Sequence, residues 1–121
     1  MLPNEEFTYQ IIGFSYQVYN ELGYGLQEKY YQRALAQLLE ENDIKYEREL
    51  YLAVKFKGVN IGKYFIDFKI NDNLVVELKV CNQFYQNHIN QVLAYLKAYN
   101  IKLGLLILFT KTGIKIKRLI V

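Results

Sequence analysis

The sequence predicts a layered α/β fold in which helices flank a mixed β-sheet and the elements follow the order ααβββαββ. Three observations predict it. Two stretches near the N-terminus carry apolar residues at helical spacing, a central block alternates apolar and polar residues, and a third helical stretch separates that block from two further strands. Because 121 residues suffice for one ordinary core but not for two, residues 1–121 are expected to form a single domain.

The first two elements are predicted to be amphipathic helices over residues 5–22 and about 27–41, separated by a glycine-containing break at residues 23–25. Glu28 stands in the first turn of the second helix, where the helix dipole favours a carboxylate. The residues expected to be buried are Phe7, Ile11, Phe14, Val18 and Leu22 in the first helix, and Tyr31, Leu35, Leu38 and Leu39 in the second.

The central block is predicted to form strands at about 46–57, 61–70 and 74–81, the last two joined as a hairpin. Opposed residues of a hairpin share a face, so the apolar sets must meet across the ladder, which requires a loop with an odd number of residues. A three-residue loop at 71–73 places Ile70 opposite Leu74 and Asp67 opposite Glu77.

The predicted register brings two carboxylates together, and their repulsion at ~5 Å costs roughly 3 kcal/mol at an effective dielectric constant of ~20. A cation is therefore expected between Asp67 and Glu77, either the ammonium of Lys79, which shares a face with Glu77, or a divalent metal. A charged, solvated hairpin face neutralised by the lysine is the alternative, because Glu-x-Lys is common in exposed strands.

The C-terminal part is predicted to form a crossover helix at about 86–99 and strands at about 103–110 and 114–120. The core stripe of this helix is expected to be Ile89, Val92, Leu93 and Leu96. A second stripe, made of His88, Gln91 and Tyr95, lies beside it. This stripe either reaches over the sheet edge towards a site or forms an ordinary boundary layer.

Composition limits the function classes. The net charge of +3 and the pI of about 8.9 are compatible with a polyanionic partner. The one cysteine excludes an intrachain disulfide and a cysteine-ligated cluster, and it suits a reducing cytoplasm. The N-terminus lacks the pattern of a signal peptide, and no apolar run approaches 18 residues. We therefore expect a cytoplasmic protein that does not enter a membrane.

Short motifs along nearly the whole chain resemble the PD-(D/E)XK nuclease superfamily, and specifically its small bacterial GxxExxY branch. Each is weak alone, but their order and spacing on the expected elements are specific. The motifs are residues 25–31 followed by Leu35, then residues 46–49, residues 57–58, Asp67 with residues 77–79, residues 91–97 and residues 104–107.

The resemblance implies a role for each residue of the central motif. Asp67 and Glu77 match the two acids, the backbone carbonyl of Leu78 would be a further metal ligand, and Lys79 matches the catalytic lysine. Glu28 resembles the extra acid that the first core helix supplies in many members. These oxygen ligands suit Mg²⁺ or Mn²⁺.

The resemblance extends to the third helix, where Gln91 and Tyr95 resemble the Gln-x-x-x-Tyr motif of RecB-type exonucleases. Gln91 would position the attacking water or a phosphate, and Tyr95 would line the substrate groove. Two features depart from the family pattern. Ile66 replaces the proline that gives the superfamily its name, and Leu108 and Thr110 replace a common Asn and Gly.

The implied function is a metal-dependent deoxyribonuclease acting in DNA repair, mobile-element processing or defence, with DNA favoured over RNA as substrate. The alternative is a catalytically silent module that binds nucleic acid or a protein partner. A homodimer would supply contact surface that so short a chain lacks. His88 and the basic C-terminal residues Lys111, Lys115, Lys117 and Arg118 are weaker candidates for phosphate contact, and a solvated surface explains them equally well.

Overall fold

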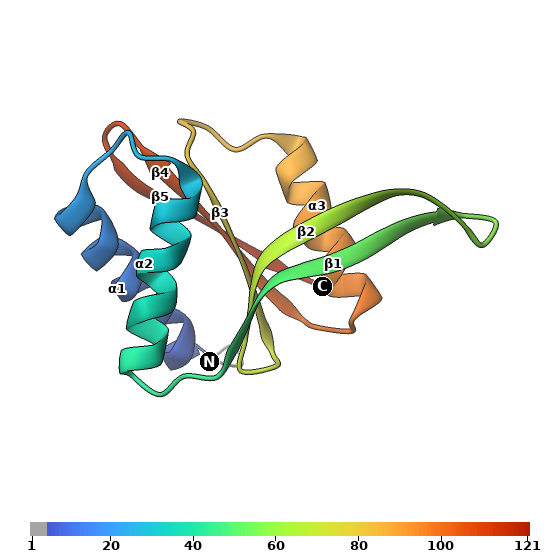
Figure 1. The fold of residues 1–121 in the computed structure, drawn as a ribbon, viewed down its shortest axis with the longest axis horizontal. Coiled ribbons are helices and arrows are strands. Elements are labelled where there is room, and N and C mark those ends of the chain that lie inside the picture. The colour runs from blue at the N-terminus through green and yellow to red at the C-terminus, as the bar shows by residue number, and fades with distance from the viewer. Residues whose placement is uncertain (1–4) are drawn as a thin grey trace.

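The protein, seen as a computed structural model, folds into one five-stranded mixed sheet with helices on both faces (Figure 1). The structure describes the backbone of residues 5–121 and the side chains from residue 7 onward. Residues 1–4, which enter the prediction about the N-terminus, lie outside this range. The elements are α1 (Glu5–Leu22), α2 (Glu28–Glu41), β1 (Tyr46–Phe56), β2 (Val59–Ile70), β3 (Leu74–Lys79), α3 (Gln86–Ala98), β4 (Leu103–Thr110) and β5 (Gly113–Ile120).

The predicted fold class and element order are confirmed, and the element bounds agree with the predicted ones to within two residues. The strand order is β1-β2-β3-β4-β5, with a parallel pair at β3–β4 and antiparallel pairs elsewhere. The parallel pair needs a crossover, which α3 provides. Among the described residues, none of the helices combines the length and apolar character that crossing a bilayer requires.

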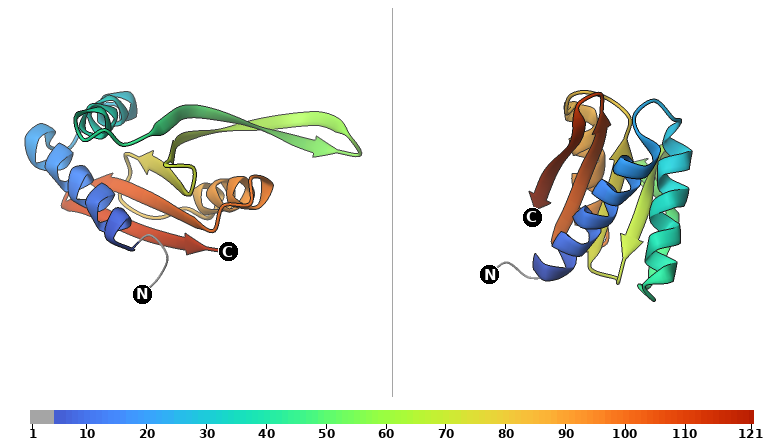
Figure 2. Two further views of the ribbon diagram at one scale, coloured as in Figure 1. Left: turned by 90° about the horizontal axis from the view of Figure 1, so that it is seen from below. Right: turned by 90° about the vertical axis from the view of Figure 1, so that its left-hand side faces the viewer.

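Two hydrophobic clusters lie on opposite faces of the sheet. The first lies under α1 and α2, the second under α3, and both views in Figure 2 show these helices on opposite sides. Strand β3 contributes to both, because Val76 and Leu78 belong to the first cluster and Val75 to the second. Gly104 lets α3 approach β4 closely, since a Cβ atom there would lie 2.8 Å from Val92 Cγ1.

The outer parts of β1 and β2 leave the body of the protein as a two-stranded arm (Figures 1 and 2). Strand β2 pairs with β3 only over residues 68–70, while its pairing with β1 continues to Val59. We call residues 50–66 the arm. The arm ends at Ile66, and the next residue, Asp67, belongs to the candidate site.

Candidate active site

Asp67 lies where three strands separate. The predicted three-residue loop is confirmed, since Ile70 pairs with Leu74. The ladder between β2 and β3 ends at the pair Phe68–Val76, one step before Asp67 and Glu77 would meet. In the described chain, the β1–β2 register also passes over Asp67, which is not paired with Glu49, a residue with a positive φ of 54°. Asp67 therefore has no ladder partner on either side.

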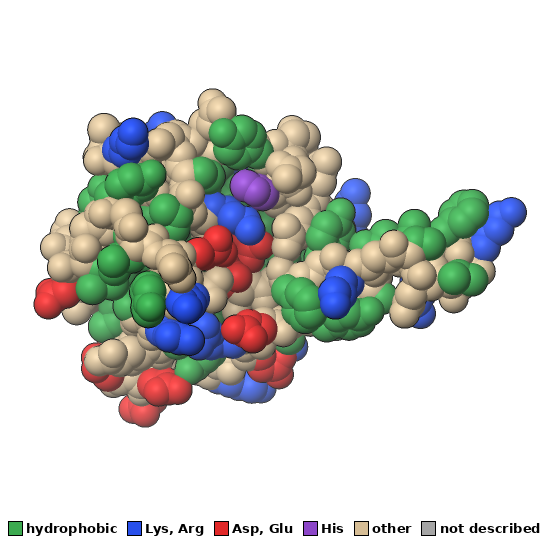
Figure 3. Space-filling view, turned by 45° about the horizontal axis from the view of Figure 1, so that its top comes forward, with side chains coloured by type: hydrophobic (Ala, Val, Ile, Leu, Met, Phe, Trp, Pro, Cys, Tyr) green, Lys and Arg blue, Asp and Glu red, His purple; other side chains and the backbone are tan. Residues whose placement is uncertain are grey.

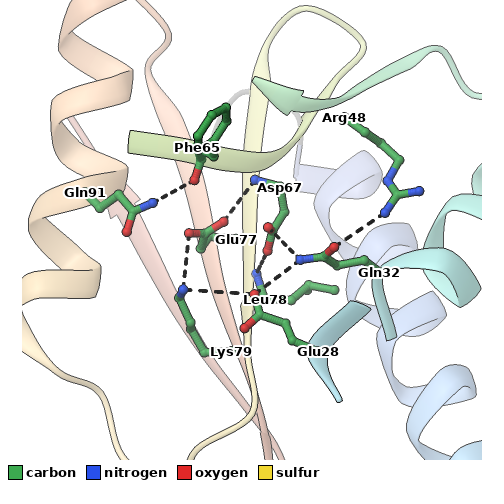
Figure 4. A network of polar contacts seen from close by, with 9 residues as sticks. All are labelled: Glu28, Gln32, Arg48, Phe65, Asp67, Glu77, Leu78, Lys79 and Gln91. Atoms are coloured by element: carbon green, nitrogen blue, oxygen red, sulfur yellow. Dashed lines mark hydrogen bonds and ion pairs between the residues drawn. The ribbon is translucent and has the colours of Figure 1, made fainter. Parts of the chain in front are cut away.

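Side chains replace the missing ladder pair, as Figure 4 shows. The backbone N–H of Asp67 donates to Glu77 Oε1 at 2.9 Å, and the N–H of Leu78 donates to Asp67 Oδ2 at 2.7 Å. Hydrogen bonds thus link the two strands at Asp67 and Glu77. The prediction of direct opposition in the ladder is corrected, because their carboxylates hold the strands together where the backbones have separated.

Burial favours the protonated forms of these acids, and the charge of Asp67 adds to this effect at Glu77 and Glu28. Glu77 is 1% exposed, and burial, followed by the charge of Asp67, raises its pKa to about 9 against the opposing effect of Lys79. Burial also raises the pKa of Asp67, although the contacts with Glu77, Leu78, Lys79 and Gln32 lower it in part. Burial and Asp67 raise the pKa of Glu28. Ionising all three acids at once is therefore unfavourable in this buried place.

Two donors lie between the three acids. Lys79 Nζ is 3.8 Å from Glu77 Oε2 and 4.0 Å from Glu28 Oε1. Gln32 Nε2 donates to Asp67 Oδ1 at 2.7 Å and to Glu28 Oε1 at 3.2 Å. The side chain of Lys79 is 23% exposed, so it is only partly buried beside Glu77. Figure 3 shows the acids and basic side chains gathered in a hollow of this face, with the one histidine at its edge.

The reasoning from sequence missed Gln32 and assigned no role to Arg48. Arg48 Nη2 donates to Gln32 Oε1 at 3.4 Å, and its guanidinium lies 5.6 Å from the ring centroid of Phe68. A signal for Gln32 was present, because it follows Glu28 by four residues and so shares a helix face with that acid. Arg48 lies in the motif at residues 46–49, but its contact with Gln32 depends on β1 lying beside α2.

The donor chemistry of this site fits a hard divalent cation. Carboxylates of Asp67 and Glu77 with raised pKa values gain from a positive charge, and oxygen ligands suit Mg²⁺ or Mn²⁺. Among the described side chains, from residue 7 onward, however, no three His, Cys, Asp or Glu residues are arranged as a ready metal cluster. The oxygens that would turn to a cation are instead facing Gln32 and Lys79. Three of the predicted ligands, Glu28, Asp67 and Glu77, therefore lie close together around Gln32 and Lys79, but they are not arranged as a metal cluster.

The polar stripe of α3 separates into different environments. Gln91 Nε2 donates to the carbonyl oxygen of Phe65 at 2.7 Å, which ties α3 to β2 two residues before Asp67 (Figure 4). His88 is half-buried, and burial, followed by the charge of Lys79, lowers its pKa. Within the described chain, its Nδ1 has no hydrogen-bond partner. His88 is therefore partly buried and lies within the electrostatic influence of Lys79.

Tyr95 does not lie on the surface of a groove, which corrects the predicted contact with substrate. Its side chain is 0% exposed, belongs to the second hydrophobic cluster and stacks on Tyr99 at 4.4 Å between ring centroids. Burial raises the pKa of Tyr95 to about 12. The helix turns this residue inward because Val92 and Leu96, three residues before and one after, face the same core.

Comparisons with known proteins agree with this fold. The family pattern described as the PD-(D/E)XK nuclease superfamily matches residues 5–119. The solved structure of a protein named SSO0001 matches with a TM-score of 0.56 and 20% identity, over 74% of this chain and 47% of that one. The chain thus spans about half the length of that protein.

A second solved structure is an alkaline exonuclease, LHK-Exo, from Laribacter hongkongensis. It matches with a TM-score of 0.45 and 10% identity, over 99% of this chain and 72% of that one. None of the curated proteins compared with this chain matches it.

Proposed function

This chain belongs to the PD-(D/E)XK nuclease superfamily, and on that premise we propose that it is a divalent-metal-dependent nuclease that hydrolyses phosphodiester bonds in DNA. The observation that carries the proposal is the group of Asp67, Glu77 and Lys79 at the point where β2 and β3 separate. Members of the superfamily generally use divalent metals, and Mg²⁺ or Mn²⁺ suits the oxygen ligands present here.

Each residue has a proposed role in this reaction. Asp67 and Glu77, with the carbonyl of Leu78 and help from Glu28, would hold the ion. A bound ion of this kind supplies an acidified water and positive charge at the phosphate. Lys79, already beside Glu77, would stabilise the negative charge that develops on the phosphate or orient the attacking water.

Gln32 and Gln91 would act on either side of this centre. Gln32 now donates to two of the acids, so it must release Asp67 Oδ1 before that oxygen can turn to an ion. We propose Gln91 as a residue that positions water or phosphate while it holds the backbone of Phe65, and with it the strand that carries Asp67.

Finer assignments are part of the same proposal. The motif at residues 25–31 supports membership of the bacterial GxxExxY branch, and through it a role on DNA in repair, mobile-element processing or defence. A single domain over residues 1–121 and a cytoplasmic location stay predictions. So does a homodimer.

A specific observation favours a second candidate function, a silent module that binds nucleic acid or protein. Oxygens of the three acids already face protein donors, Gln32 and Lys79. Such a module would bind its partner equally well after the lysine is removed, and it would turn over no substrate.

The deciding experiment is a cleavage assay of purified protein on single-stranded, duplex and branched DNA, with Mg²⁺, with Mn²⁺ and with EDTA. Cleavage is expected only with metal, and Lys79→Ala is expected to slow it by about 10²–10³-fold, as removal of one electrostatic group at a reacting centre typically does. Lys69→Ala is the matched control, because its side chain is similarly buried at 20% exposed and also ion-paired. If no DNA form is cut with either metal, the nuclease proposal fails and the silent module stands.

A further inference from the structure

The arm carries the chain's whole excess of positive charge. Residues 50–66 contain three lysines and no acidic residue, and they leave 12 basic and 12 acidic side chains in the rest of the chain. All three lysines, Lys55, Lys57 and Lys63, are exposed. Within the described residues, none of them forms an ion pair. An unneutralised basic segment of this kind attracts a polyanion.

The arm also exposes large apolar side chains that a folded body would bury. These are Tyr51, Phe56, Val59, Ile61 and Phe65, which are between 47% and 65% exposed. Figure 3 shows hydrophobic and basic side chains together along the projecting part. Contiguous exposed apolar surface on a small protein marks an interaction site.

Aromatic rings and ammonium groups lie next to each other on the arm. Lys63 Nζ is 5.5 Å from the ring centroid of Phe65, and Lys57 Nζ is 5.5 Å from that of Phe56. Tyr51 meets Phe65 edge-on at 5.8 Å between centroids. Lysines for phosphates beside aromatic faces for bases are the combination with which proteins bind single-stranded nucleic acid.

The arm leads directly into the candidate site. Phe65 is two residues before Asp67, and its carbonyl is held by Gln91. The strand from Val59 to Asp67 spans about 26 Å at ~3.3 Å per residue, enough for several nucleotides. A nucleic-acid strand lying along the arm would therefore reach the acids at the inner end of the arm.

We propose that the arm, residues 50–66, is a binding site for single-stranded nucleic acid, with its lysines on the phosphates and with Phe56 and Phe65 stacked on bases. This rests on the proposed function and names its substrate form. Two alternatives fit less well. Duplex DNA already stacks its bases on one another and leaves the aromatic faces unused, and a second copy of this chain would bring two arms of like charge together.

The test measures binding apart from cleavage, by fluorescence anisotropy of labelled oligo-dT of about 20 nucleotides and of a duplex of the same length, in EDTA. The arm variant is Lys55→Gln, Lys57→Gln and Lys63→Gln together. Its matched control is Lys111→Gln, Lys115→Gln and Lys117→Gln, which removes the same charge from the β4–β5 end. The arm variant is expected to bind oligo-dT at least tenfold more weakly and to reduce the slope of log affinity against log salt by about 2.

A second variant, Phe56→Ala, keeps the charge and removes one stacking face. It is expected to weaken oligo-dT binding by about 5- to 150-fold with an unchanged salt slope, as loss of one base–aromatic stack does. Because Phe56 is 62% exposed, circular dichroism and the melting temperature should stay as in the wild type. Both variants should leave duplex binding less affected than oligo-dT binding.

Three outcomes would overturn the inference. The first is that the arm and control triple variants weaken oligo-dT binding equally. The second is that duplex binds more tightly than oligo-dT and that Phe56→Ala leaves duplex affinity unchanged. The third is that Phe56→Ala converts a wild-type dimer to a monomer, seen by sedimentation, while oligo-dT binding stays intact. Failure of the proposed function is separate. If arm-dependent binding of oligo-dT is found without metal-dependent cleavage, the arm inference stands and the nuclease proposal falls.

Discussion

Strand β2 has two halves that share the alternation of apolar and polar residues but differ in their surroundings. Residues 68–70 lie inside the sheet, with Phe68 and Ile70 fully buried, whereas residues 59–65 run out along the arm, with Ile61 65% exposed and Phe65 49% exposed. The inner half has β3 on one side and β1 on the other, and the outer half has only β1. Alternation of apolar residues therefore indicates a strand, but the number of neighbouring strands and layers decides whether that strand is core.

The boundary between the halves is the candidate site. Ile66 packs in the second hydrophobic cluster and Phe68 in the first, although strict alternation would put both on one face. The change of face occurs at Asp67, where both ladders lack a pair. A strand that leaves its neighbour frees backbone groups, and here the carboxylates satisfy them. The same separation of the strands places the carboxylates of Asp67 and Glu77 at the candidate site.

The largest expected effect comes from replacing a phenylalanine by alanine on each side of Asp67, Phe68 in the inner half of β2 and Phe65 in the outer half. Phe68→Ala should lower the free energy of unfolding by about 3–5 kcal/mol, because a fully buried ring leaves a cavity. Phe65→Ala should cost less than about 1 kcal/mol, because half of that ring already contacts water. Urea unfolding followed by circular dichroism measures both, and equal losses would mean that the arm packs on something in solution.

The pH dependence of stability tests the burial of Glu77 at the boundary between the two halves. The ordinary pKa of Glu77 is 4.5 and its folded pKa is about 9, so between these values the folded state keeps a proton that the unfolded chain has released. Stability in EDTA should then fall as pH rises through this window, by roughly 1–3 kcal/mol between pH 6 and 8. The raised pKa values of Asp67 and Glu28 act in the same direction.

Glu77→Gln removes this titration and keeps an oxygen that can accept from the N–H of Asp67. It should therefore flatten the dependence and make the protein more stable than the wild type at pH 8, while Glu41→Gln, at an exposed position at the end of α2, should leave the slope unchanged. Urea midpoints from pH 5 to 8.5 measure the slope. A wild type whose stability rises over this range would contradict the burial of a repelling pair.

The smallest effect is expected at Tyr95, beneath the root of the arm. Its hydroxyl is buried and, within the described chain, has no hydrogen-bond partner, so Tyr95→Phe should be neutral or stabilising by up to about 1 kcal/mol. Any cleavage activity should stay within about twofold of the wild type, since the ring contacts core residues. A loss of activity of tenfold or more without loss of stability would restore Tyr95 to the substrate groove.

Much of the fold and the central acids could be predicted from the sequence alone. Helical and strand periodicities predicted every described element, and the need to match apolar faces predicted the loop at 71–73 and the pair Ile70–Leu74. These features are local or depend on one hairpin, so the chain's own periodicity determines them. Glu77 and Lys79 share a face for the same reason.

Only the tertiary structure decided what surrounds those acids. Gln32 shares a helix face with Glu28, but its contacts with Asp67 and Arg48 form only because α2 packs beside β1 and β2 in the folded protein. The burial of Tyr95 depends on which side of the polar stripe of α3 meets the sheet. The arm, too, has the sequence pattern of an ordinary strand. The exposure of its side chains depends on the fold, in which residues 59–66 pair with β1 but not with β3. Side-chain periodicity is a property of one segment, whereas burial, pKa and contact depend on segments far apart in the chain.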